Sequence, residues 1–402
     1  MDRISRLLRN DRFIYFLFLF LIIAVVTFRI VAETDGYVSP DGACYLSAAE
    51  NIVKGRGAVV KPDCAVQQAD GNLQHEFPSF TIWPLGYPWL IASLSYISGL
   101  SVLVSSKLVN FLCLILSGLL LRKIYPCSFV FPFLLFCTFP LLEIMSHSWS
   151  ENPFICFLLL LVLTIRNILK ENQQVALPYF LLTFSLVGLF LCRYIGIFFC
   201  AFAYLIVVYL FHNGEKRKSA KVFISLIVAT FLIITYLYYN YSRSGFITGT
   251  DRIGEIQMTV AQFALRVFLG LISQLNFFRY LNLKETSLFA TLFIIQFLVM
   301  AFVFKSTKWG RFFDDKSNMI FVISSFLYLL VLIPFTAFSG IDMFDYRTLA
   351  PWSFCLFVPV LSWLNLELKN QGIWRKQLAY YGLMMIVLLF NLPKKYLMEL
   401  IG

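Results

Sequence analysis

Long apolar stretches separated by short polar segments make up almost the whole of this chain. A helix that crosses a membrane needs about 20 consecutive, mostly apolar residues, and stretches of that kind recur from end to end. We expect about eleven spans on this basis. They lie near residues 13–32, 103–121, 127–145, 152–169, 177–192, 195–212, 222–240, 286–304, 318–338, 351–366 and 378–392. The pattern predicts an all-α, polytopic membrane helix bundle in which residues 1–402 form one domain.

A long polar loop follows the first span, at about residues 33–102. Residues 84–100 within it are apolar, but the stretch is short and two prolines stand near its start, so we expect a helix that lies at the membrane interface. Residues 261–282 contain two arginines and look amphipathic, which predicts a second interfacial helix. These two stretches are therefore left out of the expected spans.

Lys and Arg residues indicate the orientation of the bundle, because they favour cytoplasmic loops. If residues 1–12 lie in the cytoplasm, this segment and the short loops on the same side together hold 19 of the 33 Lys and Arg residues. These loops are residues 122–126, 166–174, 213–221, 305–316 and 368–376. The first long loop then faces outward. The net charge of +11 reflects this bias, so we expect no nucleic-acid partner.

Composition narrows the possible functions further. With 59% apolar residues and 14% charged residues, the chain resembles no soluble class of protein. No Gly-rich phosphate loop precedes a helix, which argues against a cytosolic nucleotide-sugar site. No Cys/His spacing typical of a metal site occurs. Cys44 and Cys64 both lie in the first loop, and whether they pair depends on an oxidising compartment, which the residues leave open.

Ionisable residues gather at the predicted outer ends of the spans, whereas the span centres carry almost no charge. Asp41, Glu151, Arg193 and Arg347 stand at four separate span ends. Each also has a simpler interpretation, since an Asp or Glu can cap a helix and an Arg can extend its charged end to the membrane surface. Because all four occur on one face of the bundle, they favour a shared site that acts on a lipid-borne substrate. A transporter, by contrast, usually keeps such groups near the midplane.

Several short motifs occur in an order that resembles the outer loops of GT-C membrane glycosyltransferases, in the branch of protein O-mannosyltransferases and aminoarabinose transferases. They are Pro40-Asp41-Gly42-Ala43-Cys44-Tyr45-Leu46, Gly55-Arg56-Gly57, Trp83-Pro84-Leu85-Gly86-Tyr87-Pro88, Ser150-Glu151-Asn152-Pro153-Phe154, Arg193-Tyr194-Ile195-Gly196, Tyr239-Asn240-Tyr241 with Gly245 and Gly249, and Asp345-Tyr346-Arg347-Thr348-Leu349-Ala350-Pro351. The resemblance is sparse but runs along the whole chain. Many relatives have two adjacent acids where this chain has Asp41 and Gly42, and some have a further soluble C-terminal domain.

The resemblance implies a GT-C-like fold and an inverting transfer of a sugar from a polyprenyl-phosphate donor to a lipid-, glycan- or protein-linked acceptor. Asp41 would be the catalytic base, and Glu151, the second catalytic residue, would orient the acceptor or a donor hydroxyl. Arg347, and after it Arg193, would bind the donor phosphate. Further substrate-binding residues would be Tyr45, His75, Glu76, Tyr87, Asn240 and Tyr346.

The same resemblance implies an enzyme of a bacterial inner membrane that acts on its extracytoplasmic side, among membrane lipids. No cofactor is required by the residues, although Glu151 would be able to bind a divalent metal if one is used. Two other classes remain as alternatives: a flippase or transporter, and a polysaccharide polymerase or ligase for lipid-linked saccharides. The sugar and the acceptor are not indicated by the residues.

Overall fold

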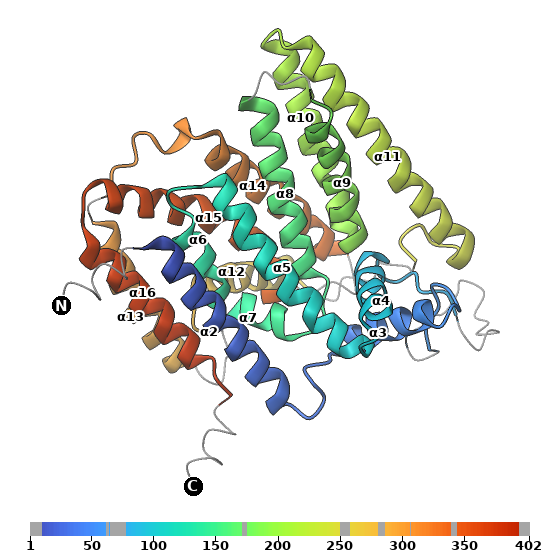
Figure 1. The fold of residues 1–402 in the computed structure, drawn as a ribbon, viewed down its shortest axis with the longest axis horizontal. Coiled ribbons are helices and arrows are strands. Elements are labelled where there is room, and N and C mark those ends of the chain that lie inside the picture. The colour runs from blue at the N-terminus through green and yellow to red at the C-terminus, as the bar shows by residue number, and fades with distance from the viewer. Residues whose placement is uncertain are drawn as a thin grey trace.

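The computed structural model describes residues 10–61, 64, 78–170, 175–249, 258–279, 286–305, 307–338 and 344–393. Their regular structure is helical, apart from one isolated β-bridge between Val59 and Ser79 (Figure 1). The helices are α2 (Asp11–Ala32), α3 (Pro40–Val53), α4 (Gly86–Ser98), α5 (Val102–Ile124), α6 (Val130–Phe133), η2 (Leu134–Cys137), α7 (Phe139–Ser146), α8 (Glu151–Lys170), α9 (Leu177–Cys192), η3 (Tyr194–Phe198), α10 (Phe199–His212), α11 (Lys216–Ser244), α12 (Val260–Leu275), α13 (Thr286–Phe304), η5 (Phe312–Asp314), α14 (Lys316–Phe338), α15 (Tyr346–Asn370) and α16 (Trp374–Phe390).

Eight of the described helical segments are long and apolar enough to cross a membrane. They are α2, α5, α8, η3 with α10, α11, α13, α14 and α15. Helices α9 and α16 stand where two more spans were expected, with 16 and 17 residues. Side chains of α11 and α13 are mostly exposed, as expected for helices that face lipid. The chain is therefore an integral, multi-pass membrane protein, and the predicted all-α helix bundle is confirmed.

One expected span, at residues 127–145, is not a continuous helix. It is divided into α6, η2 and α7, and Thr138 between the last two has extended backbone angles. Pro140 explains the break, because a proline inside a helix lacks an N–H donor and its ring clashes with the carbonyl four residues earlier. Nearly all side chains of the three pieces are buried. The short α7 thus ends inside the protein and leads directly into residues 147–150.

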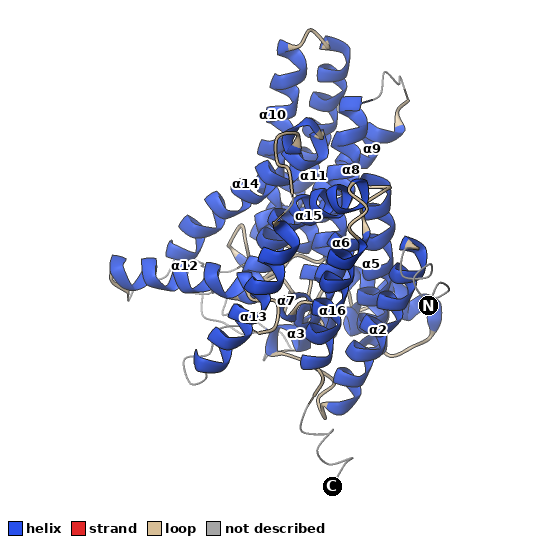
Figure 2. Cartoon of the chain, turned by 90° about the vertical axis from the view of Figure 1, so that its left-hand side faces the viewer, coloured by secondary structure: helices blue, strands red, loops and turns tan. Residues whose placement is uncertain are grey.

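Helices α4 and α12 form where the sequence predicts the two interfacial helices. Figure 2 shows α12 extending sideways from the bundle, across the direction of the longer helices. Helix α4 packs against α3 and α5. They have 13 and 16 residues, fewer than the about 20 that a spanning helix typically needs.

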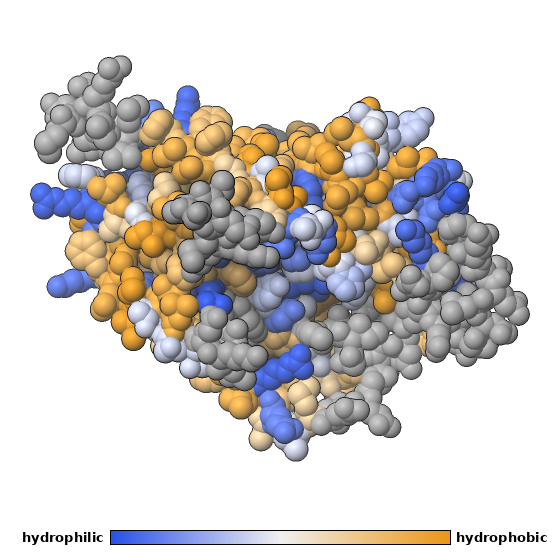
Figure 3. Space-filling model, turned by 90° about the horizontal axis from the view of Figure 1, so that it is seen from below, coloured by the Kyte–Doolittle hydropathy of each residue, from blue (hydrophilic) through white to orange (hydrophobic). Residues whose placement is uncertain are grey.

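Helices α3 and α4 lie at one end of the bundle, at the lower right of Figure 1. A disulfide between Cys44 and Cys64 ties the following loop to α3, which answers the question that the sequence leaves open. Viewed from below, the described surface shows hydrophilic side chains gathered between apolar flanks (Figure 3). The core beneath this end contains Tyr45, Tyr87 and Phe80, all of them buried.

Candidate functional site

Four charged residues from four different elements meet at this end of the bundle. Arg347 is at the centre: its Nη1 donates to Asp41 Oδ2, and its Nε donates to Glu151 Oε1 at 2.5 Å. Arg193 Nη1 donates to the same Glu151 oxygen at 2.8 Å. The sequence predicts that these four residues share one site, and the structure brings them into direct contact. Two carboxylates and two guanidinium groups leave the cluster with no net formal charge.

Asp41 lies in the first turn of α3, but it does not cap that helix. The N-cap is Ser39, whose Oγ accepts from the backbone N–H of Gly42 at 3.1 Å. The interpretation of Asp41 as a helix cap is therefore wrong. Its side chain is 35% exposed, while that of Arg347 beside it is 15% exposed. Asp41 is thus the member of the cluster most open to a ligand.

Glu151 is the first residue of α8 and is completely buried. Its Oε1 accepts from both arginines, so its carboxylate holds the two guanidinium groups beside each other. A capping residue would precede the helix and would bind backbone N–H groups instead. The capping interpretation therefore does not describe Glu151 either.

Both arginines point inward, against the simpler interpretation that they extend to the membrane surface. Arg193 ends α9 in an extended conformation and turns the chain into η3. Arg347 follows Asp345, which caps α15 through a capping box with Thr348. The Arg193 and Arg347 side chains are only 13% and 15% exposed. A positive charge in the first turn of a helix opposes the helix dipole, so the two carboxylates must stabilise Arg347 there.

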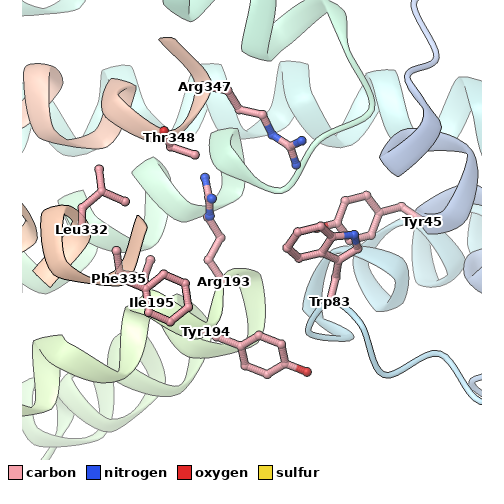
Figure 4. A pocket seen from close by; sticks show the side chains of 9 residues that line it. All are labelled: Tyr45, Trp83, Arg193, Tyr194, Ile195, Leu332, Phe335, Arg347 and Thr348. Atoms are coloured by element: carbon pink, nitrogen blue, oxygen red, sulfur yellow. The ribbon is translucent and has the colours of Figure 1, made fainter. Parts of the chain in front are cut away.

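A narrow pocket with a volume of about 30 Å³ lies beside the cluster. Figure 4 shows the two guanidinium groups between Tyr45 and Trp83 at one side and Leu332, Phe335 and Ile195 at the other. Its lining consists of Tyr45, Trp83, Arg193, Tyr194, Ile195, Leu332, Phe335, Arg347 and Thr348. The pocket therefore combines two cations with apolar walls, an arrangement that suits an anion attached to an apolar chain.

The predicted substrate-binding residues occupy different places around the pocket. Tyr45 lines it and is hydrogen-bonded to Ser150 Oγ at 3.2 Å. Burial raises the pKa of the Tyr45 hydroxyl, which therefore stays neutral. Tyr87 does not line the pocket: it packs against the Tyr45 ring, with centroids 5.4 Å apart, and so supports it from behind.

Asn240 and Tyr346 also stand outside the pocket wall. Asn240 Nδ2 donates to the hydroxyl of Tyr194 at 2.8 Å, and Tyr194 lines the pocket. The Tyr346 ring lies between those of Phe139 and Trp149, at 5.5 and 6.4 Å. His75 and Glu76 lie outside the described residues. Contact with a substrate remains a prediction for all six residues of this group.

Sequence reasoning assigned no site role to Trp83, Thr348, Leu332 and Phe335, which line the pocket. It also assigned no role to Trp149, whose ring lies against the Arg347 guanidinium at 4.5 Å. Trp83 belongs to one of the quoted motifs, which was the available signal. Leu332 and Phe335 look like ordinary span residues, so no local signal singled them out.

Glu151→Gln should destabilise the protein without changing the size of the side chain. The neutral amide would leave two partly buried guanidinium groups next to each other with Asp41 as their remaining carboxylate. Removal of one partner of a buried ion pair typically costs about 3–5 kcal/mol in the free energy of unfolding. Thermal melting in detergent measures the change, and Glu367→Gln at the other end of α15 is the control. An unchanged melting temperature would contradict the anchoring role of Glu151.

Comparisons with known proteins bear on the fold. No protein-family model and no curated protein matches the chain. The solved structure of ArnT from Cupriavidus metallidurans bound to undecaprenyl phosphate is similar to it, with a TM-score of 0.54 and 12% identity over 88% of this chain and 60% of that chain. The apo structure of ArnT gives a TM-score of 0.50 and 13% identity over 84% and 57%.

At this level of identity the similarity establishes the fold alone. This chain spans about 60% of the length of the ArnT chain it resembles. The polytopic membrane helix bundle that the sequence predicts is thereby confirmed, and its fold is similar to that part of ArnT.

Proposed function

We propose that this chain is an inverting glycosyltransferase that moves a sugar from a polyprenyl-phosphate donor to an acceptor at the outer face of the membrane. The observation that carries the proposal is the contact between Asp41 and Arg347 at the edge of a pocket with apolar walls. A base and a phosphate-binding cation are the two groups that this reaction needs within a few ångströms of each other. The ArnT structure bound to undecaprenyl phosphate shares the fold, which supports a lipid phosphate as the donor group.

The donor would bind with its phosphate toward Arg347 and Arg193 and its lipid chain toward Ile195, Leu332 and Phe335. Arginine can hold two phosphate oxygens through parallel N–H donors, and it keeps its charge at all physiological pH values. Glu151 would hold both guanidinium groups in place. Because the arginines supply the positive charge, a divalent metal is not part of this proposal.

Asp41 would then accept the proton of the acceptor hydroxyl or amine while the oxygen or nitrogen attacks the anomeric carbon. The new glycosidic bond forms as the bond from that carbon to the phosphate oxygen breaks, and the configuration at carbon inverts. The leaving polyprenyl phosphate gains negative charge, which Arg347 stabilises. The acceptor would be lipid-, glycan- or protein-linked.

Binding of the donor would also free the Asp41 carboxylate to act as the base. In the structure Arg347 donates to Asp41, so one carboxylate oxygen is occupied. A donor phosphate competes for the same N–H group and would release Asp41 for the acceptor. The donor would therefore bind first. This order makes loss of the proton from the acceptor depend on the presence of the donor.

The outer location of the site rests on two observations. The Lys and Arg bias places residues 33–102 outside, and the disulfide between Cys44 and Cys64 suits an oxidising compartment. Cys44 is in the same helix as Asp41. We therefore place the site on the extracytoplasmic side of a bacterial inner membrane.

An impermeant maleimide should label an introduced cysteine at Lys54 in intact cells, but not one at Lys216. Both positions are exposed, and they lie at opposite predicted sides of the membrane. The background should carry Cys127→Ser, since Cys127 is an exposed free thiol. Labelling after permeabilisation shows that both thiols are reactive. Labelling of position 216 in intact cells would invert the proposed orientation.

The reaction is tested with purified protein in liposomes that contain a polyprenyl-phosphate sugar and a crude acceptor fraction. Release of polyprenyl phosphate that depends on the acceptor would support the proposal. Movement of the intact lipid-linked sugar across the bilayer without release would indicate a flippase instead.

A further inference from the structure

Trp149 connects the two residues on which the proposed reaction depends. It lies in the turn between α7 and α8 and is only 5% exposed. One contact is through its ring, which the Arg347 guanidinium approaches to 4.5 Å. The other is through its indole N–H, which donates to Ser39 Oγ at 2.6 Å. Ser39 caps α3, the helix that carries Asp41, so Trp149 contacts both sides of the Asp41–Arg347 pair.

The indole is itself held in place by neighbouring groups. The His147 ring stacks on it at 4.0 Å, with an angle of 11° between the planes. His147 Nε2 lies 3.5 Å from Glu143 Oε2, and Glu143 forms a buried ion pair with Arg29 at the end of α2. A continuous series of contacts therefore runs from the first span to Arg347. Such a series fixes the plane of the indole more firmly than packing against mobile lipid would.

The contact between the Trp149 ring and Arg347 differs from a hydrogen bond, and the difference matters when Arg347 changes its hydrogen-bond partners. Arg347 uses N–H groups for Asp41 and Glu151, and a donor phosphate would compete for at least one of them. The face of the indole attracts the cation without occupying any N–H donor. This contact can therefore persist while the hydrogen bonds change.

We propose that Trp149 is a positioning residue that holds the Arg347 guanidinium in place while its hydrogen bond moves from Asp41 to the donor phosphate. The inference rests on the proposed function, since it concerns how the same site exchanges partners. Trp149 acts through the contact of its ring with Arg347, and it does not touch the reacting atoms. Its effect therefore falls on turnover more than on donor affinity.

The test compares Trp149→Leu, which removes the ring, with Trp149→Phe, which keeps an aromatic face but lacks the N–H. The control is Trp89→Leu, because Trp89 on α4 is 53% exposed. A cation–π contact of typical strength corresponds to a decrease of about 2- to 30-fold in kcat for the Leu variant. We expect KM for the donor to change less than kcat, the Phe variant to keep most of the turnover, and the control to match the wild type.

Rates are expressed per folded protein, so a purely structural role would leave kcat unchanged in the Leu variant. That result would overturn the inference. An equal loss in the Phe and Leu variants would also overturn it, because the hydrogen bond to Ser39 would then be responsible instead of the ring.

A second measurement does not depend on transferase activity. Melting temperatures of Trp149→Leu, Arg347→Gln and the double variant form a double-mutant cycle. We expect the double variant to lose less than the sum of the single losses, since both changes remove the same contact. Additive losses would overturn the inference. If the wild type shows no transfer from any polyprenyl-phosphate sugar while the cycle shows coupling, the proposed function fails and the contact stands.

Discussion

Asp41→Asn should fold as the wild type does, yet release polyprenyl phosphate about 100- to 10,000-fold more slowly, the range typical for loss of a general base. An amide of the same shape does not accept a proton at neutral pH. Ser39, not Asp41, caps α3, so the substitution leaves the cap intact. Loss of the charge near the start of the helix costs about 0.3–1 kcal/mol in stability. Loss of the ion pair with Arg347 costs about 0.2–1 kcal/mol more, since Asp41 is 35% exposed. A small decrease in melting temperature should therefore accompany a large decrease in rate.

Release of polyprenyl phosphate in proteoliposomes gives the rate, and thermal melting in detergent gives the stability. Asp345→Asn is a useful control, because Asp345 caps α15 close to the same site and Asn caps a helix about as well as Asp. A near-wild-type rate for Asp41→Asn would contradict the assignment of the base. Glu76, in the same outer loop, would then be the residue to test.

Arg347→Lys should lower kcat about 100- to 1,000-fold, similar to the loss of a donor that stabilises transition-state charge. Lysine keeps the positive charge but has a single nitrogen on a flexible stem. It cannot bridge Asp41 and Glu151 and at the same time present two parallel N–H groups to a phosphate. Arg347 makes both carboxylate contacts in the structure, so the substitution should also lower the melting temperature.

Arg243→Lys is the matched control, because Arg243 is exposed in the last turn of α11 and is not part of the pocket lining. A variant with Lys at position 347 that keeps the wild-type kcat would show that a point charge is sufficient. Arg193 would then be the main phosphate-binding residue.

Hydrophobic patterning was enough to predict most of the fold, because a bilayer accepts few spanning structures other than apolar helices. It failed at residues 127–145, where the apolar run is long enough but Pro140 breaks the helix. Hydropathy measures the length of an apolar run and does not detect a break in its backbone. Helices α9 and α16 form at the expected spans 177–192 and 378–392, and they are shorter than the eight longest segments.

The four charged residues of the site were predictable because they stand at span ends on one predicted face and within motifs that resemble those of GT-C glycosyltransferases. Which residue contacts which was not predictable, since Asp41 and Arg347 are 306 positions apart. Trp149 was missed as a partner of Arg347 for a related reason. A Trp at a span end is normally explained by the membrane interface, and only packing shows that its ring faces a guanidinium.

The most direct test of the central claim is a cryo-EM structure of the protein with bound undecaprenyl phosphate. We predict phosphate oxygens at about 2.7–2.9 Å from Arg347 nitrogens, the usual length of a charge-assisted hydrogen bond. Asp41 should then no longer accept from Arg347, and its carboxylate should face the open pocket. Phosphate density elsewhere on the protein, with the contact between Asp41 and Arg347 intact, would contradict the proposed site.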